Sequence, residues 1–126
     1  MITGLYAGLC GLLLLVLTGR VVQRRLKAQI GLGTGGDADL ERRVRVHANF
    51  VEYAPLALIL LYLVEQSGAG AAYVHAFGAT FVIARVLHAV GLSASAGRSP
   101  GRFFGTLASL LVILGLSAWL IVGALI

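Results

Sequence analysis

Four long apolar stretches constrain the fold of this chain more than any other feature of its sequence. They occupy residues 2–22, 44–64, 71–92 and 103–126. A transmembrane helix needs about 20 apolar residues to cross a hydrocarbon layer about 30 Å thick, because each residue adds about 1.5 Å. Only 12% of the residues are charged, whereas a soluble domain carries roughly 25%. The pattern therefore predicts an integral membrane protein.

The number and spacing of these stretches predict the architecture. We expect an all-α fold, an integral membrane four-helix bundle in which residues 1–126 form a single domain. The predicted helices lie at about 2–25, 40–66, 71–92 and 102–126. The first stretch is expected to be a retained helix rather than a signal peptide, because its leader, MITG, has no basic residue.

The basic residues are concentrated beside the apolar stretches. A net charge of +5 would suggest a nucleic-acid partner in a soluble chain. Nine of the ten lysines and arginines, however, lie near two of the predicted connections: Arg20, Arg24, Arg25, Lys27, Arg42, Arg43, Arg45, Arg98 and Arg102. The positive-inside rule places both basic loops in the cytoplasm and both termini outside. We therefore expect a lipid environment, such as a bacterial inner membrane, and no nucleic-acid partner.

Other motifs predict no nucleotide or metal site. The segment GLGTGG has no strand before it and no P-loop lysine after it, so it is interpreted as a connector. Three scattered histidines and one glutamate within an apolar stretch do not form a metal-binding set, so we expect no metal. The single cysteine, Cys10, excludes an intrachain disulfide and is interpreted as a packing residue.

A polar stripe interrupts the second apolar stretch. Arg45, Asn49 and Glu52 are spaced i, i+4 and i+7, which puts them on one face of a helix. Arg85 and His88 form an i, i+3 pair at a similar depth in the third helix. An unpaired charge in a membrane costs roughly 2.5–3.5 kcal/mol. Two interpretations remain open: Glu52 pairs with Arg85 or Arg45 to hold the helices together, or the set binds an anionic or zwitterionic ligand.

The segment ERRVRVHANFVEYAPLALIL resembles the second-helix signature of the MAPEG family, the membrane-associated proteins of eicosanoid and glutathione metabolism. The resemblance extends over nearly the whole chain, through GLGTGGDADLERR, ARVLHAVGL and SPGR in the same order. It implies a four-helix protomer that assembles as a homotrimer. It also implies that glutathione, as a cosubstrate, binds between adjacent subunits near the cytoplasm.

The same resemblance implies roles for particular residues. The glutathione-contacting positions of the second and third helices correspond to Arg45, Asn49, Glu52, Tyr53, Arg85 and His88. The catalytic position beside the glutathione sulfur corresponds to Arg102, where a guanidinium would stabilise the thiolate. An arginine that some relatives use at the end of the first helix corresponds to Arg24 or Arg25.

Two departures from the family pattern bear on the substrate. Leu92 stands where some relatives have a tyrosine, and Phe103 stands where a serine follows the activating arginine. Both weaken the case for prostaglandin-synthase-like isomerisation. The function implied is a membrane-bound glutathione transferase or peroxidase-like enzyme that joins the glutathione thiolate to small lipophilic electrophiles or reduces lipid hydroperoxides. A small drug or proton-coupled transporter, a noncatalytic membrane scaffold, and an enzyme that uses another thiol remain alternatives.

Overall fold

The structure, a computed structural model that describes residues 1–94 and 99–126, consists of four long helices. These are α1 (Thr3–Ala28), α2 (Ala38–Gln66), α3 (Ala71–Ala94) and α4 (Pro100–Leu125). Each is long and apolar enough to cross a membrane, and the described residues contain no strand. The predicted all-α, four-helix membrane fold is confirmed. Arg98, one of the basic residues used to predict orientation, lies outside the described residues.

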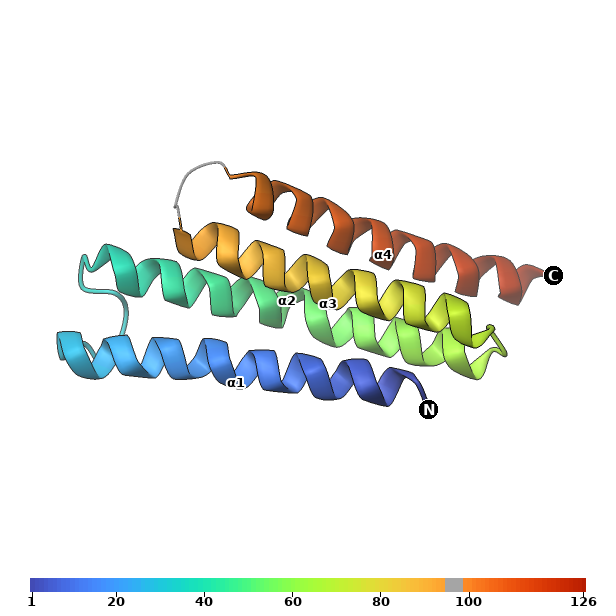
Figure 1. Cartoon of the computed structure of the whole chain (residues 1–126), viewed down its shortest axis with the longest axis horizontal. Helices are drawn as coiled ribbons and strands as arrows, with labels where there is room; N and C mark the ends of the chain where they lie inside the picture. The colour runs from blue at the N-terminus through green and yellow to red at the C-terminus, as the bar shows by residue number, and fades with distance from the viewer. Residues whose placement is uncertain (95–98) are drawn as a thin grey trace.

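The helices run antiparallel to their neighbours in the chain (Figure 1). α2 and α3 lie in the middle, α1 packs mainly on α2, and α4 packs mainly on α3. The 29–37 loop and the start of α4 lie at one end of the bundle, which we call the basic end. Both chain termini and the connection between α2 and α3 lie at the opposite end (Figure 1).

Local side-chain and backbone features set the helix ends. Asp37 caps α2 by accepting a hydrogen bond from the Leu40 N–H at 2.8 Å. Ser99 caps α4 through the Arg102 N–H, and Pro100 begins the helix. α1 continues past its expected end near residue 25, because the chain leaves the helix only at Gln29, which has a left-handed conformation.

Two glycines allow α3 to approach both of its outer neighbours closely. A Cβ atom at Gly78 would lie 2.3 Å from the Tyr6 ring of α1. A Cβ atom at Gly105 of α4 would lie 2.6 Å from the Ala84 carbonyl oxygen of α3. Small residues at such crossings let helix backbones pack at short range. These crossings place the start of α4 against the part of α3 that carries His88.

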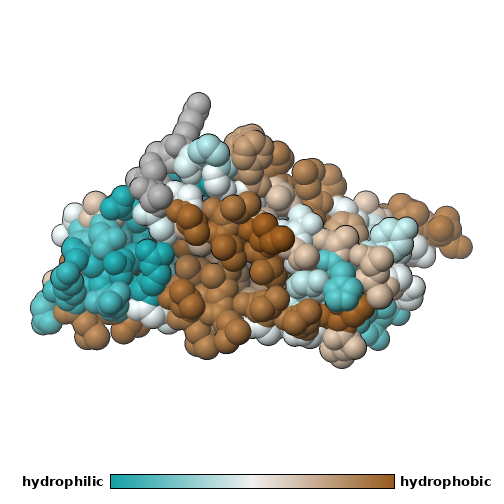
Figure 2. Space-filling model, viewed as in Figure 1, coloured by the Kyte–Doolittle hydropathy of each residue, from teal (hydrophilic) through white to brown (hydrophobic). Residues whose placement is uncertain are grey.

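The surface of the bundle is apolar along most of its length. Figure 2 shows a hydrophobic band over the middle of the molecule and a hydrophilic cluster at the basic end. Large side chains such as Leu15 (68% exposed) and Leu114 (64% exposed) lie on the outside of α1 and α4. So much exposed apolar surface is unfavourable in water and favourable in lipid.

Asp37 joins the ends of α1 and α2 at the basic end. Arg24 donates to both of its carboxylate oxygens, at 2.5 and 3.2 Å. This charge-assisted hydrogen bonding, together with the Leu40 N–H, holds the pKa of Asp37 below its usual range. The ionised carboxylate therefore stabilises the folded state, fully so above the unfolded-state pKa of about 3.9.

We expect the Asp37 contribution to be lost as the pH falls from about 4 through the lower folded-state pKa. Asp37→Asn should lower the melting temperature at neutral pH, because it removes the ion pair with Arg24. The melting temperature of this variant should also fall less than that of the wild type as the pH is lowered, because the variant lacks the carboxylate that becomes protonated. Thermal unfolding in detergent across this pH range measures both effects. Glu41→Gln is the matched control, since Glu41 makes no ion pair with any described residue, and an equal effect there would refute the assignment.

Candidate functional site

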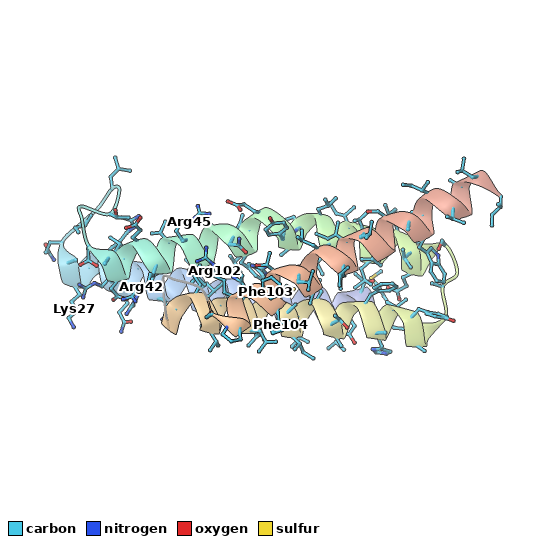
Figure 3. All side chains as sticks on the ribbon, turned by 90° about the horizontal axis from the view of Figure 1, so that it is seen from above. Lys27, Arg42, Arg45, Arg102, Phe103 and Phe104 are labelled. Atoms are coloured by element: carbon cyan, nitrogen blue, oxygen red, sulfur yellow. The ribbon has the colours of Figure 1, made fainter. Side chains whose placement is uncertain are left out.

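A polar pocket of about 350 Å³ opens at the basic end, between α2, α3 and α4. Figure 3 shows Arg42 and Arg45 of α2 close to Arg102 at the start of α4. The lining residues are Ala38, Glu41, Arg42, Arg45, Asn49, His88, Leu92 and Arg102. Four predicted site residues therefore line one cavity, although they come from three helices: Arg45, Asn49, His88 and Arg102.

The polar stripe of α2, formed by Arg45, Asn49 and Glu52, extends from this pocket onto the outer face of the helix. An oxygen of the Glu52 carboxylate lies 3.8 Å from a terminal nitrogen of Arg45. Both side chains are more than half exposed, at 53% and 56% respectively. Of the two ion pairs considered for Glu52, the structure contains the one with Arg45. An exposed charged pair near the middle of α2 is unusual for a helix that crosses a membrane, because lipid does not solvate charge.

Arg85 lies behind the pocket and is almost completely buried, with 1% of its surface exposed. Its guanidinium donates hydrogen bonds to Asn49 Oδ1 and, at 3.2 Å, to Ser109 Oγ. The guanidinium carbon lies 5.5 Å from the centre of the Tyr53 ring, within the range of a cation–π interaction. No carboxylate of the described residues lies within 4 Å of Arg85. Arg85 and Tyr53 thus support the pocket from outside its lining.

His88 faces the pocket from α3 and is 2% exposed. Its Nδ1 atom is buried and has no hydrogen-bond partner among the residues that the structure describes. A buried, unpaired ring nitrogen is unfavourable unless a ligand or a water molecule completes its hydrogen bonding. His88 therefore leaves an unsatisfied polar atom in the wall of the pocket.

A second, wider and more open pocket of about 860 Å³ lies along the first turns of α4. Its lining is mainly apolar: Ser99, Pro100, Arg102, Phe103, Phe104 and Thr106. The rings of Phe103 and Phe104 meet edge to face, with 5.3 Å between their centres. Arg102 lines both pockets, and so lies where a polar cavity and an apolar one adjoin.

The charge of the polar pocket favours anionic groups. Arg42, Arg45 and Arg102 offer guanidinium donors, which bind carboxylates strongly. Glu41 in the lining and Glu52 beside Arg45 offer acceptors for an ammonium group. Within residues 1–94 and 99–126, no group of three histidine, cysteine or acidic side chains is placed to hold a metal ion. The site suits a zwitterionic organic ligand.

Some contacts were not predicted from the sequence. Ser109 was not singled out, although a serine four residues after Gly105 in an apolar helix is a signal for a buried hydrogen bond. Of the two arginines considered at the end of α1, Arg24 binds Asp37. Arg25 donates to the carbonyl oxygens of Ile30 and Gly33. Within this chain, both are thus used to anchor the 29–37 loop.

Comparison with known proteins identifies a family and two similar membrane proteins. A family model described as the MAPEG family matches residues 3–122, a range that includes all the predicted site residues. The "Inner membrane protein YecN" of Escherichia coli strain K12 is 36% identical over 91 residues, which cover 72% of this chain and 70% of that relative. YecN of Escherichia coli O6:H1 strain CFT073 matches with the same identity and coverage.

Proposed function

Because the chain belongs to the MAPEG family, we propose that it is a glutathione-dependent membrane enzyme. In this proposal, glutathione binds in the polar pocket, and its thiolate attacks a lipophilic electrophile or reduces a lipid hydroperoxide. The observation that carries the proposal is the position of Arg102, which lines both the polar and the apolar pocket. A thiolate held at Arg102 would face a substrate dissolved in lipid.

The chemical groups of glutathione match those of the polar pocket. The tripeptide has two carboxylates, one ammonium group and two amides. Arg42 and Arg45 of the lining suit the carboxylates, and Glu52, which lies outside the lining but 3.8 Å from Arg45, suits the ammonium group. Asn49 and His88 suit the peptide amides, because both line the pocket with side chains that form hydrogen bonds. A volume of about 350 Å³ is within the range of small-ligand pockets.

The proposed chemistry uses proximity and thiolate stabilisation. A guanidinium beside the sulfur favours the thiolate, which is the nucleophilic form. In conjugation, the thiolate forms a bond to the electrophilic carbon, and the leaving group departs with its electron pair. In peroxide reduction, two glutathione thiols are oxidised to a disulfide while the hydroperoxide is reduced to an alcohol and water. Phe103 and Phe104 would hold the lipophilic substrate within reach of the sulfur.

The exposed pair of Arg45 and Glu52 supports assembly. Against lipid, charges at this position would cost roughly 2.5–3.5 kcal/mol each. A second copy of the chain placed against α2 would remove them from lipid and could add groups to the ligand site. We therefore propose a homotrimer, as the family resemblance implies, with glutathione between adjacent subunits.

We also propose an inner-membrane location with the basic end in the cytoplasm and both termini outside. The four apolar helices and the similarity to an inner membrane protein of Escherichia coli support this location. The concentration of lysines and arginines near one end, where Figure 2 shows a hydrophilic surface, supports the orientation. In this orientation, the polar pocket would open toward cytoplasmic glutathione.

Glutathione binding tests the proposed function. We expect detergent-purified wild-type protein to bind glutathione saturably by calorimetry. Arg45→Ala should weaken the affinity about tenfold or more, because it removes a charged hydrogen-bond donor. Lys27→Ala is the matched control, since Lys27 is an exposed basic residue at the same end that does not line the pocket. It should bind as the wild type does.

Assembly must be verified alongside binding. Native mass spectrometry of each variant is expected to give a trimer, so that lost binding can be separated from lost assembly. If well-folded, assembled wild-type protein fails to bind glutathione, the proposed enzyme is wrong, and transport or another thiol becomes the better explanation.

A further inference from the structure

The contact between Arg85 and Asn49 determines which way the Asn49 amide points. An asparagine side chain has an oxygen that accepts hydrogen bonds and a nitrogen that donates two. An arginine guanidinium only donates. The end of Asn49 that faces Arg85 must therefore be the oxygen, Oδ1, and the structure has this arrangement.

Arg85 is itself held in place by groups from α2 and α4. One terminal nitrogen donates to Asn49 of α2, and the other donates to Ser109 Oγ of α4 at 3.2 Å. The Ser109 hydroxyl donates its single hydrogen to the Gly105 carbonyl oxygen at 2.8 Å, so its oxygen is left to accept from Arg85. The Tyr53 ring lies against the guanidinium. Because Arg85 is buried and fixed in this way, it cannot turn to let the Asn49 amide rotate.

The fixed amide presents its nitrogen, Nδ2, as a donor. Asn49 lines the polar pocket, and its Nδ2 makes no hydrogen bond to any described residue. The buried positive charge of Arg85 also polarises the amide, which strengthens its N–H groups as donors. This position of the pocket therefore favours an acceptor oxygen, such as a carboxylate or a peptide carbonyl, and disfavours a donor.

We propose that Arg85 is a positioning residue that acts through Asn49. It stays outside the pocket, locks the amide oxygen of Asn49 away from the ligand, and so makes the amide nitrogen a dedicated donor to an acceptor oxygen of glutathione. This inference rests on the proposed function for the identity of the ligand, and it assigns Arg85 a role different from the direct ligand contact that the family resemblance implies.

Asn49→Asp is the discriminating variant. An aspartate keeps an acceptor oxygen for Arg85, and it adds an opposite charge, so a purely structural contact is retained or strengthened. It removes the donor to the ligand and places a carboxylate oxygen there instead. We expect Asn49→Asp to melt no lower than the wild type, yet to bind glutathione at least about tenfold more weakly in calorimetry.

Variants at Arg85 and Ser109 complete the test. Arg85→Met should weaken glutathione binding and raise KM more than it lowers kcat, because the amide of Asn49 is then free to rotate. Arg85→Lys should restore part of the affinity. Ser109→Ala removes one of the two hydrogen bonds that hold Arg85 and leaves the one to Asn49, so it should weaken binding less than Arg85→Met does.

The outcomes separate this inference from the proposed function. If the folded Asn49→Asp variant binds glutathione as tightly as the wild type does, the positioning role alone is overturned. Folded wild-type protein that binds no glutathione would overturn the proposed function and this inference with it.

Discussion

Replacing Arg102 with methionine is expected to lower the rate of glutathione conjugation at pH 7 by about 10–30-fold. A free thiol has a pKa of about 8.5, and a neighbouring cation lowers the pKa of an acid by roughly 1–3 units. A thiol with a pKa of about 8.5 is only about 3% ionised at pH 7, so lowering its pKa by 1–3 units raises the thiolate fraction by about 8- to 30-fold. Methionine retains much of the side-chain volume and removes the charge, so the loss should appear mainly in kcat.

The ultraviolet absorbance of the thiolate gives a direct measurement. Wild-type protein saturated with glutathione should show thiolate absorbance at neutral pH, and Arg102→Met should show it only at higher pH. The pH–rate profile should shift in the same direction. Arg102→Lys should recover part of the rate, since it keeps a positive charge.

Arg42→Met is the matched control for the Arg102 variant. Arg42 lines the polar pocket but not the apolar one, whereas Arg102 lines both. We expect Arg42→Met to weaken glutathione binding and to leave the pH dependence of the rate unchanged. If both variants shift the pH profile equally, a general positive potential at the basic end is responsible, and Arg102 has no special role beside the sulfur.

Features within one helix are predictable from this sequence. The four helices follow from runs of apolar residues, because the length needed to cross lipid is fixed by helix geometry. Arg45 and Asn49 share a pocket because four residues make about one turn, which is a property of α2 alone. The predicted membrane bundle and one edge of the site therefore required no knowledge of how the helices pack.

Features between helices are less predictable, because they depend on how each helix is rotated and where it crosses its neighbour. No spacing in the sequence links Arg85 with Ser109, yet the two form a buried hydrogen bond. The family resemblance implies that Arg85 contacts the ligand, whereas the structure places it behind Asn49 and outside the pocket lining. The adjoining pockets at Arg102 likewise depend on where α4 begins relative to α2 and α3.

Gly105→Val is expected to be the most disruptive single substitution in α4. A Cβ atom there would lie 2.6 Å from the Ala84 carbonyl oxygen, 2.7 Å from the His88 amide nitrogen and 2.8 Å from His88 Cβ. Two of these are backbone atoms of α3, which cannot move aside as the end of a flexible side chain can. Overpacking a core costs about 1–3 kcal/mol, and we expect the free energy of unfolding to fall by at least that amount.

The same substitution should also abolish glutathione binding, because relief of the clash must separate α4 from α3 and move Arg102 away from His88. Gly123→Val is a closely matched control: it introduces the same side chain in the same helix, at a glycine where a Cβ atom would meet nothing within 4 Å. We expect that control to melt and bind as the wild type does. Thermal unfolding and calorimetry on the two variants thus distinguish a specific helix crossing from a general intolerance of α4 to larger residues. Equal destabilisation by both would contradict the close crossing at Gly105, whereas intact binding by Gly105→Val would show that the pocket does not depend on it.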